Sequence, residues 1–159
     1  MSDSLEHAPS RFPWPPVLYL AAIAISVLLN YAVPLPWLLP PLSDILFAIG
    51  CLLVLAAAYL YIGAFRALQR GNTTIHPTKG ANHLVTTGPF AISRNPIYLG
   101  NTVLMFAIGM ISGSVWFFVL GLAAAFATQK LAIEPEERHL ELRFGKRFRD
   151  YQKKARRWF

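Results

Sequence analysis

Charged residues are scarce in this chain. Only 14% of its 159 residues are Asp, Glu, Lys or Arg, and 55% are hydrophobic, whereas a soluble domain carries about 25% charged residues. This shortage excludes an ordinary soluble globular domain. The length fits one domain, and we expect residues 1–159 to form a single membrane-embedded unit.

Negative charge is especially rare. The chain has 8 acidic and 15 basic residues, for a formal net charge of +7. Such an excess can indicate nucleic-acid binding, but the basic residues lie just outside apolar runs and cluster in the last thirty positions. That placement is typical of cytoplasmic anchors facing anionic lipid, and no nucleic-acid-binding motif is present. We therefore expect a lipid bilayer, and no nucleic acid, as partner.

Cysteine is nearly absent, since Cys51 is the only one. An internal disulfide is excluded, and within an apolar run this side chain is expected to be a small packed hydrophobe. No small-residue cleavage site follows the polar, proline-rich start "MSDSLEHAPSRFPWPP". We expect the first apolar run to be kept as an anchor rather than removed as a signal peptide.

The common catalytic motifs are missing as well. No Gly-x-Gly-x-x-Gly, Walker or Gly-x-Ser-x-Gly pattern occurs. Glu136 and His139 form one Glu-x-x-His, whereas a di-iron site needs two such motifs and two further Glu residues. His7, His76 and His83 lack ligand spacing, so no metal site is expected.

Long apolar runs are what the chain has in abundance. The second run has no charge between Asp44 and Arg66, and at about 1.5 Å per residue it crosses a hydrocarbon core of about 30 Å. Ser-Gly-Ser at 112–114 is so short that the helices on either side must be antiparallel neighbours. The sequence predicts an all-α integral membrane protein with about four transmembrane helices and a C-terminal helical hairpin, the spans covering residues 17–33, 42–65, 97–111 and 115–133.

The loops differ in charge. Residues 34–43 and the Ser-Gly-Ser turn carry no Lys or Arg, whereas residues 66–96 hold four and the C-terminal tail is dense in both. Because cytoplasmic loops are enriched in Lys and Arg, both termini and the central loop are expected in the cytoplasm.

The C-terminal tail has helical periodicity. Its apolar residues recur at steps of three or four, and Pro135 is compatible with a first helical turn or a kink. We expect an amphipathic basic helix, interrupted near Gly145, that lies along the membrane surface or folds back over the central loop. The apolar positions are Leu140, Phe144, Phe148, Tyr151, Ala155 and Trp158.

The stretch "LVTTGPFAISRNPIYLG", residues 84–100, is the most irregular part of the chain. Gly88, Pro89 and Pro96 interrupt any continuous helix. The backbone groups freed by these breaks cannot face lipid and need protein, water or a ligand as partners. A polar cofactor bound by an irregular loop at the cytoplasmic rim would satisfy several of them.

Four nearby side chains could take part in such a site. Taken singly, Arg94 can be a snorkelling anchor and Tyr98 an interfacial aromatic residue. Glu136 and Glu137 are adjacent carboxylates near a membrane exit and among many cations. We expect at least one of them to pair with Arg94 or with a ligand.

Two ordered motifs in the second half of the chain carry a family resemblance. "HLVTTGPFAISRNPIYLG", an apolar hairpin and then "EPEERHLELRFGKRFRDYQKKARRW" resemble the isoprenylcysteine carboxyl methyltransferase family and, more broadly, phospholipid-methyltransferase-like membrane enzymes. The resemblance covers about residues 76–158. It implies S-adenosylmethionine-dependent methyl transfer, with a cofactor pocket built by the last two spans and the adjoining cytoplasmic segments rather than by a Rossmann sheet.

The resemblance also implies roles for particular residues. Arg94 would stabilise an anionic acceptor or the cofactor carboxylate, and Glu137 would orient Arg94 or take a proton. An apolar slot suits adenine, and carboxylate or amide oxygens suit the ribose hydroxyls and the ammonium group. The implied cofactor contacts are Asn82, His83, Leu84, Val85, Phe90, Asn95, Pro96, Ile97, Tyr98 and Glu136.

Three positions depart from the family pattern. Asn95 replaces a histidine and cannot take a proton near neutral pH, which favours a ligand-binding role. Ala132 stands where the prenylcysteine enzymes have a substrate-carboxylate arginine, so that substrate is not expected. Phe90 only lacks a tyrosine hydroxyl. We expect a lipophilic or small acceptor entering from the membrane, and a bacterial inner-membrane enzyme.

Two other functions fit parts of the sequence. A sterol-reductase-like enzyme using NADPH shares the C-terminal architecture, but it would need more spans and further basic contacts for the 2′-phosphate. A non-enzymatic adaptor whose basic tail binds anionic lipid fits the composition but leaves the Gly-Pro and Arg-Asn-Pro breaks unexplained.

Overall fold

The computed structural model describes residues 13–71 and 84–159. All the regular elements within these ranges are helical, which confirms the predicted all-α membrane fold. In chain order they are α1 (Trp14–Ala32), α2 (Leu42–Arg70), η2 (Gly88–Ala91), α3 (Pro96–Ser112), α4 (Trp116–Thr128), η3 (Gln129–Ile133), α5 (Glu134–Phe144) and α6 (Lys146–Lys154).

Three stretches of helix in the described residues are long and apolar enough to cross a membrane. They are α1, α2 and a continuous helix from Trp116 to Phe144, while α3 is a shorter apolar helix of 17 residues. Large apolar side chains on their outer faces are exposed, among them Leu20 at 67% and Leu55 at 66%. So much exposed apolar surface suits lipid contact rather than water.

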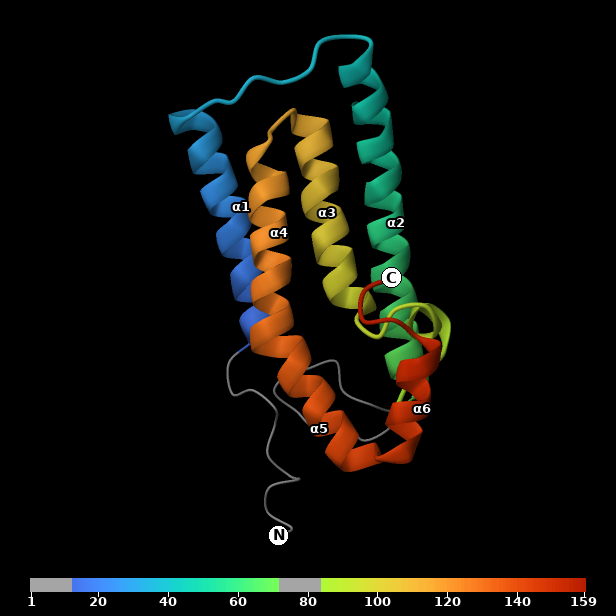
Figure 1. The fold of residues 1–159 in the computed structure, drawn as a ribbon. Helices are drawn as coiled ribbons and strands as arrows, with labels where there is room; N and C mark the ends of the chain where they lie inside the picture. Colours follow the sequence, from blue (N-terminus) through green and yellow to red (C-terminus); the bar gives the residue numbers. More distant parts are fainter. Residues whose placement is uncertain (1–12, 72–83) are drawn as a thin grey trace.

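The helices α1 to α4 form an antiparallel bundle (Figure 1). Each packs on its neighbour in the spatial order α1, α4, α3, α2. Tyr19 of α1 lies within 2.6 Å, hydroxyl to hydroxyl, of Thr102 of α3. The connection between α1 and α2 crosses the far end of the bundle, away from α5 and α6.

Small residues let these helices approach closely. A Cβ added to Gly109 of α3 would lie 2.7 Å from the Phe118 ring of α4, and one added to Gly63 of α2 would lie 2.6 Å from Pro89 of η2. Between α3 and α4, Gly113 has φ +70° and ends α3 in a left-handed conformation, which glycine adopts without strain. The predicted hairpin is therefore present.

The fourth span continues beyond its predicted end at residue 133. Its helix passes through η3, a π-helical turn, directly into α5, where Pro135 lies in the first turn. A proline ring clashes with the carbonyl four residues earlier in a regular helix, and a wider π turn relieves that crowding. α2 likewise extends to Arg70 rather than ending at residue 65.

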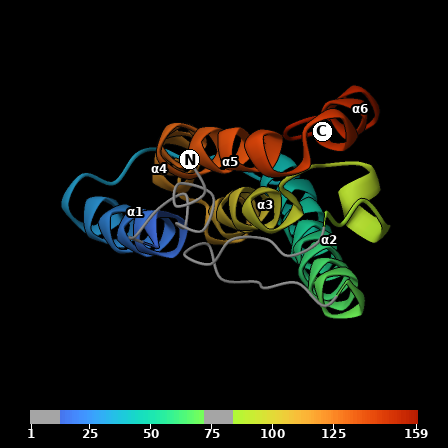
Figure 2. The same cartoon turned by 90° about the horizontal axis from the view of Figure 1, so that it is seen from below.

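The C-terminal helix breaks at Gly145, which has φ +52°. α6 then turns back toward the end of the bundle (Figure 1), and Figure 2 shows from below that α5 and α6 lie along one side of it. Its buried residues Phe148 and Tyr151 form a cluster with Ala155, and Leu84 of the central segment packs against it. Of the two predicted placements for this tail, folding back over the central segment is the one observed.

Candidate functional site

Two contacts join residues 94–98, at the start of α3, to the acidic pair Glu136 and Glu137 at the start of α5. The Tyr98 hydroxyl donates to the Glu136 carboxylate at 3.3 and 3.4 Å. The Arg94 guanidinium pairs with Glu137 at 2.8 Å between Nη2 and Oε1. Residues about forty positions apart in the sequence are thus held together, as the predicted pairing of Arg94 with a glutamate required.

The Glu137 carboxylate lies between two guanidinium groups. It is only 8% exposed. Its Oε1 accepts from Arg94, and its Oε2 accepts from Arg157 Nη2 at 2.6 Å. These hydrogen bonds raise the pKa of Arg157 above its usual value. Two guanidinium groups thus share one carboxylate, and the triad carries a formal net charge of +1.

Most donors of Arg94 are used within the protein. Its Nε and Nη2 donate to Glu137, and its Nη1 donates to the carbonyl oxygens of Ala155 and Gln152 at 2.7 and 3.3 Å. A guanidinium has five N–H groups, so four interactions leave little capacity for a ligand. The arrangement fixes the plane of this side chain.

Asn95 and Pro96 form the start of α3. The Asn95 N–H donates to Ser93 Oγ at 3.1 Å, and the Asn95 side-chain amide donates to the Arg157 carbonyl at 2.9 Å. Pro96 is buried at the first position of α3, where its missing N–H costs nothing. Ile97 follows in the same turn and is partly buried.

The apolar residues predicted to contact the cofactor lie in different surroundings. Leu84 packs on the cluster formed by Phe148, Tyr151 and Ala155, and Val85 lies close to Gly71. The carbonyl of Phe90 accepts from the Tyr151 hydroxyl at 2.6 Å.

Burial raises the pKa of the Tyr151 hydroxyl, so this donor stays protonated. The remaining two predicted contacts, Asn82 and His83, lie outside the described residues.

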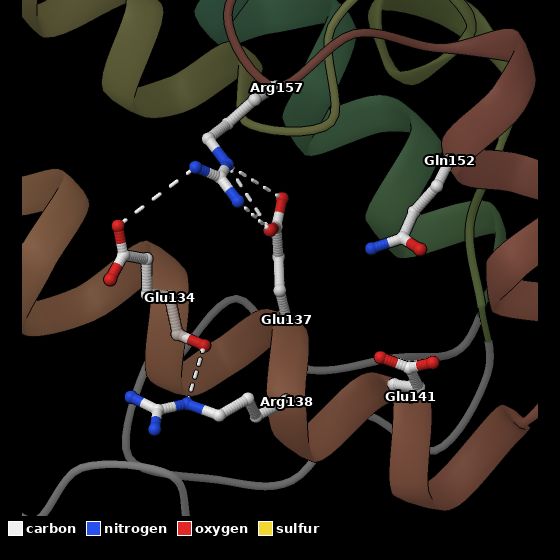
Figure 3. Close-up of a pocket in the computed structure, with 6 residues that line it drawn as sticks. All are labelled: Glu134, Glu137, Arg138, Glu141, Gln152 and Arg157. Atoms are coloured by element: carbon white, nitrogen blue, oxygen red, sulfur yellow. Dashed lines mark hydrogen bonds and ion pairs between the residues drawn. The ribbon is translucent and has the colours of Figure 1, made fainter.

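An open pocket of about 420 Å³ lies beside the Glu137 network. Figure 3 shows Arg157 between Glu134 and Glu137, and Gln152 on the facing element. The lining of the pocket contains both acidic and basic side chains. It comprises Glu134, Glu137, Arg138, Glu141, Gln152 and Arg157. Glu136 is absent from this lining and instead contacts Tyr98 of α3.

Arg157 was not among the residues predicted for the site. Its side chain is 35% exposed, yet it makes the shortest contact to Glu137. It is one of 15 basic residues, and its neighbour Arg156 has the same charge. Only the fold distinguishes the two, because α6 turns back and brings residue 157 to α5.

Comparison with known proteins places this chain in a family. The sequence profile of the family described as phospholipid methyltransferase matches residues 45–147, which is well over half of the chain. The nickel-cobalt-cadmium resistance protein NccN of Alcaligenes xylosoxydans xylosoxydans is 34% identical over 79 residues, a match that covers 50% of this chain and 37% of that relative. The matched part is thus little more than a third of the relative's length.

No solved structure matches the chain significantly. The family match nevertheless includes the central segment, the α3–α4 hairpin and both glutamates of the acidic pair. It agrees with the family resemblance expected from the two motifs. With its apolar spanning helices, the chain is an integral membrane protein that belongs to the phospholipid methyltransferase family.

Proposed function

We propose that this protein transfers a methyl group from S-adenosylmethionine to a lipophilic or small acceptor that reaches the site from the membrane. One observation carries the proposal. The Arg-Asn-Pro-x-Tyr segment and the Glu-Glu pair are joined by two parallel contacts, Tyr98 to Glu136 and Arg94 to Glu137. The two motifs of the resemblance are therefore in contact, which supports the proposal of a single site.

The donor set fits the cofactor. Glu136 is partly exposed, and its contacts with Tyr98 are long, at 3.3 and 3.4 Å. A carboxylate has about four acceptor positions, so Glu136 keeps capacity for ribose hydroxyls or an ammonium group. When bound, S-adenosylmethionine supplies an already activated methyl group. The residues of the protein then have to orient the partners and exclude water.

The other proposed contacts surround this pair. Leu84, Val85 and Phe90 supply apolar surface for an adenine ring. Asn95, Pro96 and Ile97 supply the first turn of α3, next to Tyr98. Asn82 and His83 precede Leu84 in the chain and remain proposed on the resemblance alone.

For Arg94 and Glu137 the contacts favour one of the predicted roles. Both carboxylate oxygens of Glu137 accept hydrogen bonds from guanidinium groups within the protein, Oε1 from Arg94 and Oε2 from Arg157. We infer that Glu137 orients Arg94 rather than acting as a base. Arg94 is nearly saturated by internal acceptors. Its contribution at the site is then mainly a fixed positive charge and a fixed position of the backbone before Asn95.

The proposed site lies at one end of the bundle, and charge suggests which end this is. Arg66 and Arg70 of α2 lie toward the same end as α5 and α6 (Figure 1), whereas residues 34–41 at the other end carry no Lys or Arg. By the positive-inside rule, we propose a cytoplasmic site with both termini on that side, in a bacterial inner membrane.

The proposal is tested by following a labelled methyl group from S-adenosylmethionine to its product. Membranes containing the protein are incubated with methyl-labelled S-adenosylmethionine, and the labelled product is identified. We expect label in a lipid or small-molecule fraction. Glu136→Ala should abolish this label, while Glu141→Ala, which removes an exposed carboxylate from the same helix, should keep it.

A parallel measurement addresses the reductase alternative. Thermal unfolding is followed with S-adenosylmethionine or NADPH present. Stabilisation by S-adenosylmethionine alone supports the proposal, because a ligand that binds only the native state raises its stability. Larger stabilisation by NADPH, or no methyl transfer to any fraction, would contradict it.

A further inference from the structure

The end of the chain runs back along the central segment. Residues 155–158, here named the strap, leave α6 and lie beside residues 92–95, as the red tail near the base of α3 shows in Figure 1. The Arg94 N–H donates to the Arg156 carbonyl at 2.8 Å, and the Arg156 N–H donates to the Ile92 carbonyl at 3.3 Å. The strap and the segment before α3 thus pair like two short strands.

Side chains reinforce this pairing. The Arg157 carbonyl accepts from Asn95 Nδ2 at 2.9 Å and from Ser93 Oγ at 3.4 Å. The Trp158 indole N–H donates to Gln129 Oε1 of η3 at 2.9 Å. The strap therefore joins the segment before α3 to the π turn that leads into α5.

Arg157 connects the strap to the Arg94–Glu137 ion pair. Its Nε and Nη2 donate to Glu137 at 3.2 and 2.6 Å. Ala155, two residues earlier, accepts from Arg94 at 2.7 Å. Both partners of the Arg94–Glu137 pair are therefore also tied to the strap, one through a carbonyl and one through a guanidinium. A strap that detached would release both partners at once.

The second contact of the site, between Tyr98 and Glu136, lies next to the Arg94–Glu137 pair. Glu136 is adjacent to Glu137, and Tyr98 lies four residues after Arg94, in the first turn of α3. We propose that Arg157 is a positioning residue that, through the strap, holds the Arg-Asn-Pro-x-Tyr segment against α5 at the separation that S-adenosylmethionine binding requires. The claim that this separation serves S-adenosylmethionine binding rests on the proposed function. The claim that Arg157 holds the segment against α5 does not.

The test uses the full-length protein in detergent micelles and three variants. Arg157→Ala removes the guanidinium, and Arg157→Lys keeps the charge but loses the paired donors. Lys154→Ala is the matched control, because it removes the same charge from an exposed position on the last turn of α6. Hydrogen exchange of residues 90–98 is measured without ligand, and S-adenosylmethionine affinity is measured by calorimetry.

Hydrogen bonds between charged groups contribute about 1.5–3 kcal/mol, which corresponds to roughly tenfold or more. For Arg157→Ala we expect exchange of residues 90–98 about tenfold faster and cofactor affinity about tenfold weaker. Arg157→Lys should fall in between, and Lys154→Ala should match the wild type. Both effects should be present when the variant is still fully folded at the temperature of measurement.

Unchanged exchange at residues 90–98 in Arg157→Ala would overturn the inference. So would a lower melting temperature with unchanged cofactor affinity, because a purely structural role predicts that result. If the wild-type protein binds no S-adenosylmethionine, the proposed function fails, and the exchange measurement still decides whether Arg157 holds the segment.

Discussion

The helical bundle and the polar end that closes it are stabilised in different ways. In the bundle, α1 to α4, large apolar side chains face outward and small residues allow close packing. The polar end comprises residues 84–95, α5, α6 and the strap. Its centre is Glu137, 8% exposed between Arg94 and Arg157. The bundle is a packed set of apolar helices, whereas the polar end contains the Arg94–Glu137–Arg157 charge network.

The two regions should therefore respond differently to substitution. Helices in lipid gain little hydrophobic driving force from association, so packing and a few hydrogen bonds hold them together. A buried charge network behaves differently, because removing one partner leaves the others buried and unpaired. Many bundle substitutions should cost little, and single substitutions in the network should cost much.

The largest effect is expected from Glu137→Ala. It leaves Arg94 and Arg157 facing each other without the shared carboxylate, and breaking a buried pair costs about 3–5 kcal/mol. We expect a large drop in melting temperature in detergent and loss of S-adenosylmethionine binding. Glu141→Ala on the same helix, where the carboxylate is 46% exposed, is the control. An equal loss in both variants would contradict a special role for the network.

The second-largest effect is expected at the contact between α2 of the bundle and η2 of the polar end. Gly63 of α2 faces Pro89 so closely that an added Cβ would lie 2.6 Å away. Gly63→Val should therefore push η2 off α2 and destabilise the protein by about 1–3 kcal/mol, measured by thermal unfolding. Cys51→Ala, at an exposed position of the same helix, should stay within about 0.5 kcal/mol. Wild-type stability of Gly63→Val would show that this contact is dispensable.

Tyr98→Phe should change binding more than stability. It removes the hydroxyl that donates to Glu136 while keeping the ring. Because the contact is long, we expect a loss below the usual range for a hydrogen bond to a charged group, about threefold to tenfold in S-adenosylmethionine affinity. Calorimetry checks this result. A lowered melting temperature without a change in affinity would assign Tyr98 to the scaffold instead.

The smallest effect is expected within the bundle. The Tyr61 hydroxyl of α2 donates to Asn101 of α3 at 2.6 Å, and hydrogen bonds between membrane helices contribute about 0.6 kcal/mol on average. Tyr61→Phe should lower stability by about that amount and leave cofactor affinity unchanged. A loss comparable with that of Glu137→Ala would remove the contrast between the two regions.

The same contrast explains what the sequence could predict. The three spanning helices, the shorter apolar α3 and the hairpin follow from local patterns, namely apolar runs and the turn at Gly113. The sequence left open whether α4 continues into α5, because Pro135 fits the first turn of a new helix or a kink, and the π turn before it shows that the helix continues. Pairing of a glutamate with Arg94 or with a ligand was predicted because Glu136 and Glu137 are adjacent carboxylates near a membrane exit and among many cations.

Arg157 could not be predicted, because its importance depends on the path of the chain after Gly145. Nothing in the local sequence separates it from Arg156, whose side chain is exposed. The contacts of the strap join residues about sixty positions apart, such as Asn95 and Arg157. Such pairings are decided by the packing of α6 on Leu84, which no local pattern encodes.

We propose that the segment before α3 and the acidic pair of α5 together bind S-adenosylmethionine. Equilibrium calorimetry on the purified wild-type protein, on Tyr98→Ala and on Glu136→Ala tests this proposal directly. We expect saturable binding to the wild type and clear weakening in each variant. Absence of binding to the wild type, or equal binding to all three proteins, would contradict it.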